Sequence, residues 1–266
     1  MAIWSKTNQE LNFNNTDQYE VVMLADKDGN IINSSGAASN IPIAEGTVTG
    51  YSHINKFGYS NDIQTLSTIW DNSTIYEYSS VDGAITVESD ALTNGDDGAV
   101  IEVQGLDADY NTVVQDVVIS GSTGVGGIDL IRIFRARVKT PASGESSNVG
   151  VISIDIDNAL RAKILVGKGQ TLMSLYTVPA GKTAYFLNIT MSVDKNVDVL
   201  FKIFSREFGE AFNIKGQFGT FGTPIDHNYP IPLRFEEKSD IEIQAVSGNQ
   251  CGGGATFDII LVDNPV

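Results

Sequence analysis

The amino-acid sequence predicts an all-β protein: an antiparallel β-sandwich, jelly-roll-like, with an extended N-terminal arm and little helix. Apolar and polar residues alternate along many short segments, so each segment can turn one face to a core and the other to water. Gly, Asn and Asp, which favour turns, separate these segments. A hydrophobic content of 42% with only 19% charged residues also excludes a chain that is disordered throughout.

About eleven strands can be counted in this pattern, a number typical of a sandwich. The clearest cover residues 84–88, 99–104, 112–119, 130–138, 149–156, 185–191, 197–204, 240–246 and 256–262. The best helical candidate is residues 158–165, a short segment next to Gly167, and residues 163–166 fit a strand equally well.

The N-terminal third differs from the rest of the chain. Residues 1–80 are rich in Asn, Ser and Thr with widely spaced aromatic residues, which predicts an arm that lies across another surface. Within it, the apolar runs 20–24 and 31–32 flank an Asp-Gly pair, a strong hairpin signal. Residues 81–266 then form the β-sandwich domain. The sequence leaves open whether this domain is one sandwich or two, divided near residues 157–169.

Composition excludes several classes of function. The net charge of −16 argues against docking on DNA, RNA or an anionic membrane, because affinity for phosphates comes mainly from Lys and Arg. A single Cys allows no intramolecular disulfide and no thiolate zinc site. The sequence shows no export signal and no stretch apolar enough to span a bilayer. We therefore expect a soluble chain with neither a nucleic-acid nor a membrane partner.

Three loops have some likeness to ligand-binding motifs. Residues 180–183 (Ala-Gly-Lys-Thr) end like a phosphate-binding loop, but the first Gly of that motif is replaced by Tyr176 and a strand follows instead of a helix. Residues 107–111 begin like a calcium loop, yet positions six and twelve are Thr112 and Val118, which excludes an EF-hand. A different calcium turn stays open for this loop or for residues 94–98; solvated turns are the simpler interpretation.

The remaining candidates do not form an active-site pattern. His53 and His227 have no second ligand at a defined spacing, and Cys251 lies in a glycine-rich loop. Carboxylate pairs such as Glu207 with Glu210 are common in acidic proteins. We therefore expect no catalytic residues, no cofactor and no metal, and the protein is predicted not to be an enzyme.

Two sets of residues are better suited to contacts with other subunits than to catalysis. The aromatic residues of the arm are suited to anchor it on a neighbour, and one strand gathers basic residues that can meet another subunit's acidic surface. The candidate interface residues are Trp4, Phe13, Tyr19, Arg132, Arg135 and Arg137.

Several segments resemble signatures of virion proteins of tailed bacteriophages, notably marine ones. They are residues 55–60 with 68–71, residues 101–107 with 113–121, and residues 176–185 with 237–241. The resemblance implies a virion structural protein assembled in the host cytoplasm, such as a capsid decoration (cement) protein. It also implies a homo-oligomer, with a trimer favoured, whose partners are the major capsid protein or other virion proteins.

Two other functions remain open at this stage. The first is a neck, tail or fibre component whose β-sandwich binds a carbohydrate or receptor. That function needs an exposed aromatic platform, for which the candidates are Tyr51, Tyr59, Trp70, Tyr76 and Tyr78. The second is an enzyme on a β scaffold, such as a glycan hydrolase, which no acid–base set in the sequence supports.

Overall fold

The computed structural model describes residues 24–25, 31–32 and 41–265, which belong to two compact units, Met1–Thr49 and Gly50–Val266. In the first unit, β1 (Leu24–Ala25) pairs antiparallel with β2 (Ile31–Ile32), where the sequence predicts a hairpin. A single helical turn, α1 (Ile41–Ala44), follows. No helix among the described residues is long and apolar enough to cross a membrane.

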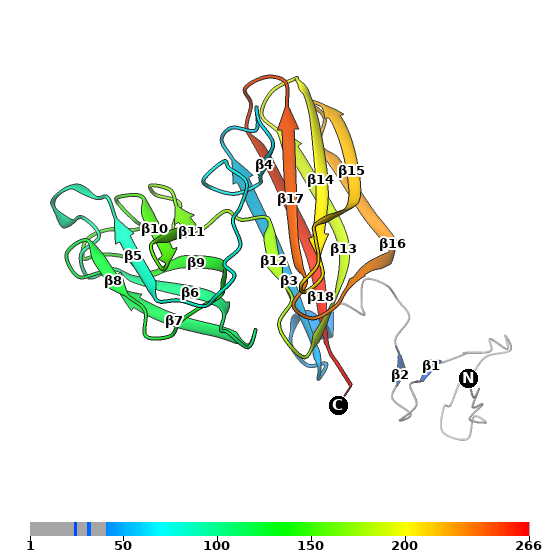
Figure 1. The fold of residues 1–266 in the computed structure, drawn as a ribbon, viewed down its shortest axis with the longest axis horizontal. Coiled ribbons are helices and arrows are strands. Elements are labelled where there is room, and N and C mark those ends of the chain that lie inside the picture. The colour runs from blue at the N-terminus through cyan, green and yellow to red at the C-terminus, as the bar shows by residue number, and fades with distance from the viewer. Residues whose placement is uncertain (1–23, 26–30, 33–40, 266) are drawn as a thin grey trace, which may run out of the picture. The chain divides into compact units, whose positions relative to one another are not determined.

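The second unit contains a β-sandwich that we call the main sandwich (Figure 1). One sheet has the strand order β16-β13-β18-β3, and the other has the order β12-β17-β14-β15 with β4 also paired to β17. The strands are β3 (Tyr51–Ser60), β4 (Ser67–Thr68), β12 (Leu175–Thr177), β13 (Lys182–Val193), β14 (Asp198–Arg206), β15 (Asn213–Phe221), β16 (Ile225–Phe235), β17 (Asp240–Ser247) and β18 (Gly253–Asp263).

Between β4 and β12 the chain builds a second pair of sheets, which we call the inserted lobe. Its sheets have the strand orders β11-β10-β5-β8 and β7-β6-β9. Its elements are β5 (Ile85–Ser89), the 3-10 turn η1 (Leu92–Asn94), β6 (Val100–Leu106), β7 (Thr112–Val118), β8 (Thr123–Val125), β9 (Arg132–Thr140), β10 (Ile152–Ile156) and β11 (Ala159–Ile164). All pairings among the described strands are antiparallel, which confirms the predicted fold class.

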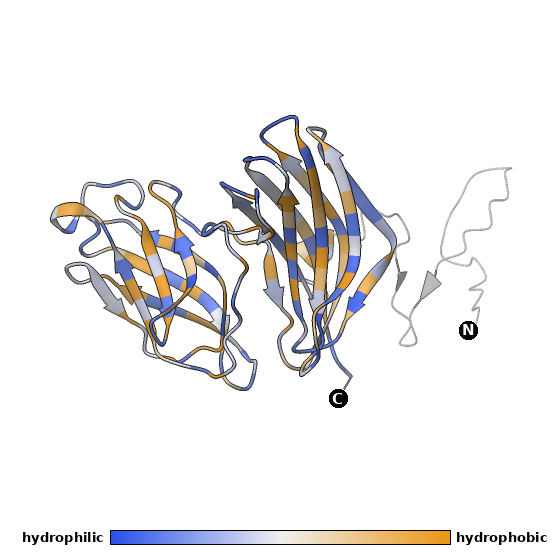
Figure 2. Ribbon diagram, turned by 45° about the horizontal axis from the view of Figure 1, so that its top comes forward, coloured by the Kyte–Doolittle hydropathy of each residue, from blue (hydrophilic) through white to orange (hydrophobic). Residues whose placement is uncertain are grey.

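Each pair of sheets encloses its own apolar core. Phe186, Phe201 and Phe257 are fully buried in the main sandwich, with the rings of Phe186 and Phe257 stacked at 5.0 Å between centroids. The inserted lobe buries aliphatic side chains such as Ile101 and Ile152. Hydrophilic and hydrophobic residues alternate along the strands in Figure 2, as the period-two pattern requires.

The predicted arm of residues 1–80 is too long, because the second compact unit begins at Gly50. β3 pairs with β18 along ten residues, and Ile63 and Ile69 are fully buried in the main core. The sequence gives little sign that β3 is a core strand, because the inner face of β3 carries few large apolar residues. A Cβ atom on Gly58 would lie 2.3 Å from the Ser174 nitrogen and 2.4 Å from the Ile69 oxygen, so another backbone occupies the space of a core side chain.

The predicted division near residues 157–169 is also wrong. Asp157 and Asn158 have φ values of 49° and 62° and form the tight turn between β10 and β11, inside the inserted lobe. Two successive residues with positive φ are the mark of a two-residue hairpin turn rather than a domain linker. The candidate helix 158–165 is strand β11, and the actual crossings between the two sandwiches lie after β4 and before β12.

Candidate functional site

The most distinctive polar cluster is an ionic junction where the inserted lobe meets the main sandwich. The Asp240 carboxylate on β17 accepts hydrogen bonds from Arg132 of β9, with Nε at 3.0 Å and Nη2 at 3.2 Å. It also accepts from Arg206 of β14, whose Nε lies 3.1 Å away, and from the Thr177 hydroxyl at 2.6 Å. Asp240 is 2% exposed and Arg132 is 5% exposed, so this ion pair is removed from water.

Strand register explains part of this arrangement. Asp240 lies directly opposite Arg206 on β14 and Thr177 on β12, so three neighbouring strands place their polar side chains in one row. Arg132 reaches the same carboxylate from the inserted lobe, 108 residues earlier in the chain. A buried charge is costly unless it is paired and hydrogen-bonded, and here two guanidinium groups and a hydroxyl meet one carboxylate.

Glu242 is the second acid of the junction, two residues along β17. It accepts hydrogen bonds from the Tyr78 hydroxyl at 3.2 Å and the Thr68 hydroxyl at 3.3 Å, and from the Gln244 amide. Burial raises the pKa of Glu242 to about 7, and the nearby Asp240 acts in the same direction against the lowering effect of these hydrogen bonds. This pKa places the titration of the Glu242 carboxyl near neutral pH.

Aromatic rings surround the two guanidinium groups. The Tyr78 ring centroid lies 5.2 Å from Cζ of Arg132 and 5.0 Å from Cζ of Arg206, and the Phe212 ring lies 4.6 Å from Arg206. Tyr78 continues into an edge-to-face series with Tyr76 at 4.8 Å and Trp70 at 5.0 Å from Tyr76. Burial raises the pKa values of Tyr76 and Tyr78, so both hydroxyls stay protonated. The arrangement supplies cation–π attraction without adding charge.

One further contact joins the two sandwiches, and another joins the two crossing segments. Lys56 on β3 is buried and donates to the Phe134 carbonyl of β9, and burial lowers the pKa of Lys56 to about 7, with Arg135 adding to the effect. At the crossing itself, the Leu172 N–H donates to the Asp71 carboxylate at 2.5 Å. Burial raises the pKa of Asp71 to about 7, although the bond from Leu172 opposes the rise.

Arg132 was predicted to contact another subunit, and the structure corrects this. Its charge is balanced by Asp240 of the same chain, and its burial leaves it no surface to offer. Alternation along a strand tells which residues share a face, but it does not tell what lies against that face.

Arg135 and Arg137 lie on the outer side of β9. Arg135 donates to Gln170 at 2.9 Å, and Arg137 forms two hydrogen bonds with Glu102 of the adjacent β6. The Arg137 bonds lower the pKa of Glu102 to about 2, so this pair stays ionised. Their predicted role in an interface stays a prediction, with the charge of Arg137 already balanced within the chain. Trp4, Phe13 and Tyr19 lie outside the described residues.

The loops that resemble calcium turns use their carboxylates internally. Asp107 accepts the N–H groups of Asp109 at 3.0 Å and Asn111 at 2.9 Å. Asp96 is 1% exposed and accepts from the Ser89 hydroxyl at 2.5 Å and from two backbone N–H groups of the loop before β10. Within the described ranges, no three His, Cys, Asp or Glu side chains gather as metal ligands.

The other sequence candidates are dispersed. His53 contacts Asp258 at 2.8 Å, whereas His227 packs between Phe218 and Tyr229 on another part of the sheet. Cys251 is 1% exposed. Residues 180–183 form a turn into β13 in which Gly181 has a φ of 71°.

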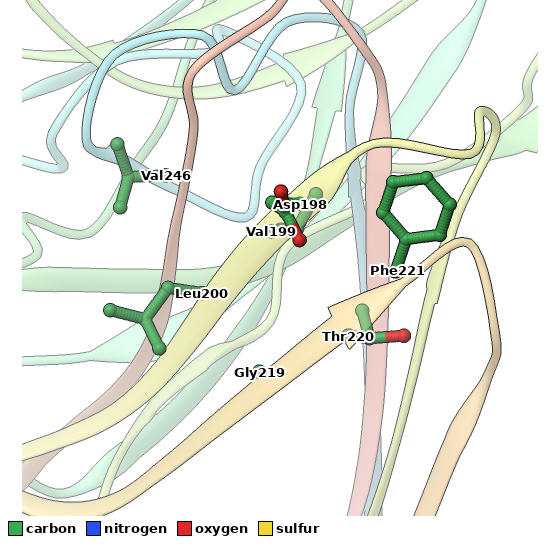
Figure 3. Close-up of a pocket in the computed structure, with 7 residues that line it drawn as sticks. All are labelled: Asp198, Val199, Leu200, Gly219, Thr220, Phe221 and Val246. Atoms are coloured by element: carbon green, nitrogen blue, oxygen red, sulfur yellow. The ribbon is translucent and has the colours of Figure 1, made fainter.

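A shallow groove of about 450 Å³ lies at one end of the β12-β17-β14-β15 sheet. Leu200 and Val246 come from neighbouring strands, and Phe221 lies at the end of β15 (Figure 3). Asp198 is the one ionisable side chain in the lining, so the groove is mostly apolar and has no acid–base pair.

The residues of the junction could not be identified from the sequence alone. Asp240, Glu242 and Gln244 alternate with Ile in the pattern of a strand with one solvated face, and that face is in fact buried. Lys56 has a similar surrounding of Asn, Ile and Phe that gives no sign of burial.

No protein-family model matches the sequence, and no curated protein matches it. Among solved structures, the chain is 13% identical to a chain of T=1 particles derived from infectious bursal virus, over 82% of its length and 71% of that chain, with a TM-score of 0.24. For the Gt strain of infectious bursal disease virus the identity is 13%, the coverage 81% and 73%, and the TM-score 0.21. For the VP2 subviral particle of that virus the identity is 12%, the coverage 82% of this chain and 73% of that chain, and the TM-score 0.19. Similarities this weak imply neither a shared fold nor a shared function.

Replacing Arg132 tests whether the junction stabilises the second unit. We expect Arg132→Ala to lower the free energy of unfolding by about 3 kcal/mol in urea denaturation, because it removes one partner of a buried carboxylate. Arg234→Ala is the matched control, since Arg234 pairs with Glu236 on the surface and its loss should leave the midpoint nearly unchanged. Equal midpoints for the two variants would contradict the importance of the junction.

The raised pKa of Glu242 predicts a specific pH dependence. Between its ordinary value of 4.5 and about 7, the folded state holds a proton that the unfolded chain has lost, so stability falls as pH rises through this range. Glu242→Gln removes this loss, and the variant should gain on the order of 3 kcal/mol relative to wild type between pH 4.5 and 7. Urea denaturation at a series of pH values measures the difference, in which the titrations of Asp71 and Lys56 cancel. A difference in unfolding free energy between variant and wild type that stays the same at every pH would contradict the prediction.

Proposed function

We propose that this chain is a non-enzymatic structural component of a bacteriophage virion that decorates and stabilises the capsid through contacts between subunits. The observation that carries the proposal is the ionic junction. Asp240 and Glu242 are bound by side chains from both sandwiches, so the two sandwiches of the second unit are fastened to each other. A protein that holds its neighbours at fixed positions needs a rigid arrangement of its own contact surfaces. The junction supplies a fixed connection between the two sandwiches that carry these surfaces.

The segments that resemble phage virion proteins support the same proposal. Residues 55–60 lie in β3, and residues 101–106 and 113–118 lie in the paired strands β6 and β7. Residues 176–177 lie in β12, next to the junction. The resemblance therefore concerns strands of both sandwiches, as expected if it reflects a shared scaffold.

A neck, tail or fibre component is the alternative location, and the predicted aromatic platform does not favour it. Trp70 and Tyr76 are 2% and 4% exposed, and Tyr78 packs against the guanidinium groups of the junction. Tyr51 is exposed, and Tyr59 is half-buried. These five residues thus do not form one exposed surface, and capsid decoration remains the preferred proposal.

Copy number in a purified virion tests the proposed location. We expect quantitative mass spectrometry of the phage that carries this sequence to find the protein in hundreds of copies, as decoration of the head requires. A count of about six or twelve would indicate the neck or tail, by the symmetry of those parts. Absence of the protein from the particle, or degradation of a host polysaccharide by the purified protein, would contradict the proposal.

A homotrimer is the proposed assembly, and exposed edges support it. β15 lies at the edge of its sheet, and Ile214, Phe221 and Ile231 on β15 and β16 are 50%, 61% and 84% exposed. An edge strand presents unpaired N–H and C=O groups that can pair with another chain. We expect the full chain to sediment as a trimer at micromolar concentration. A chain that lacks residues 1–49 should keep its β circular dichroism but sediment as a monomer, because the aromatic residues of the arm are expected to anchor each copy on its neighbour and the edge strands alone would not hold the trimer. A full chain that stays monomeric would count against an intrinsic trimer.

A further inference from the structure

A row of polar side chains crosses the outer face of the β16-β13-β18-β3 sheet. Asn55 lies opposite Asp258, Asp258 opposite Asn188, and Asn188 opposite Asn228, so four strands place an amide or carboxylate at one level. Three strand spacings give the row a length of roughly 14 Å. Asn55 and Asn228 are exposed, and Asp258 and Asn188 are partly exposed.

Asp258 fixes the orientation of its neighbours. Its carboxylate accepts hydrogen bonds from Nε2 of His53 at 2.8 Å and Nδ2 of Asn55 at 2.9 Å. Partial burial acts to raise the pKa of Asp258, but the bonds from Asn55 and His53, together with the neighbouring Asn188 amide, outweigh it and lower the pKa. The carboxylate is therefore ionised and acts only as an acceptor.

This orientation determines what the row offers to a ligand. Because Asn55 gives one N–H to Asp258, its amide keeps its second N–H and its carbonyl oxygen for an outside group. Asn188 and Asn228 add two further amides to the same row. His53 adds an imidazole ring beside this row, with Nε2 directed at the Asp258 carboxylate. Paired donors and acceptors of this kind match hydroxyl groups, which donate and accept at once.

Apolar side chains lie in the adjacent rows. Ile260 is opposite both His53 and Tyr185, and on the other side of the polar row Phe57 lies opposite Thr256. Tyr185, Phe57 and Ile260 are all partly exposed. Aromatic rings beside hydrogen-bonding groups suit a ligand that has both polar edges and apolar faces. A sugar ring, with hydroxyls at its rim and C–H groups on its faces, has this character.

Charge narrows the class of ligand further. Asp258 and Asp226 lie on this face, and the one guanidinium that these four strands carry, that of Arg234, is paired with Glu236. The whole chain carries a net charge of −16. Anionic glycans are thus repelled, and a second copy of the chain would bring acids against acids.

From these observations we propose that the outer face of the β16-β13-β18-β3 sheet binds a neutral glycan across the Asn55–Asp258–Asn188–Asn228 row. The proposal goes beyond the virion role and stands independently of it, because a virion count and a glycan-binding assay can fail separately.

The test uses the full chain on a printed array of neutral gluco-, manno- and galacto-oligosaccharides, with sialylated and sulfated glycans beside them. We expect binding to neutral members only. Calorimetry with the neutral oligosaccharide of strongest signal should show at least a ten-fold loss of affinity for Asn188→Ala and for Asn55→Ala. Asn55 lies on an edge strand, so its replacement should disturb folding less than that of Asn188. Circular dichroism of both variants checks that they fold.

Gln217→Ala is the matched control, because Gln217 is an exposed amide on β15 of the opposite sheet and its loss should leave binding unchanged. The proposal is overturned if wild type binds no neutral glycan, if anionic glycans bind equally well, or if both row variants bind as wild type does. It is also overturned if the row variants change only the oligomeric state in sedimentation, since the face would then be a contact between copies.

Discussion

The carboxylate of Asp240 is the group on which the arrangement of the second unit most depends. An inserted lobe connected by two crossings would otherwise be free to hinge at both of them. Arg132 from the lobe and Arg206 from the main sandwich meet on this one side chain, so displacing Arg132 would leave the buried Asp240 with Arg206 as its one cationic partner. Lys56 on β3 donates to the Phe134 carbonyl of the lobe and so connects the lobe to the main sandwich at a second place.

This constraint also decides which groups remain for function. The ionisable residues whose pKa values are most displaced towards neutrality, Glu242, Asp71 and Lys56, are bound inside the junction or at the crossing. What the second unit presents to its surroundings are sheet faces and edges: an apolar groove beside Leu200 and an ordered polar row around Asp258.

The sequence predicts the fold class well and its boundaries poorly, for separate reasons. Alternation along the strands reflects a local rule of side-chain direction, so it identifies the sandwich. The role of β3 escapes it, because at Gly58 the inner face meets another backbone instead of a core side chain. The charge of Arg132 is evident from the sequence, but its partner is more than a hundred residues away and no spacing rule connects the two. The polar row around Asn188 likewise needs the strand order, which a sequence alone does not provide.

The two crossings have a consequence for how such a molecule can change. The Ser174 N–H donates to the Ile69 carbonyl at 2.9 Å, and Trp70 forms a bridge with Met173, so the lobe leaves and returns at adjoining points. A short turn could close that gap without stretching the main sandwich, as at the joints where whole domains are gained or exchanged. Because its two crossings adjoin, the inserted lobe could be replaced by another domain without a change in the main sandwich. A substitute domain without an equivalent of Arg132 would leave Asp240 paired with Arg206 alone, on a face that the lobe no longer covers.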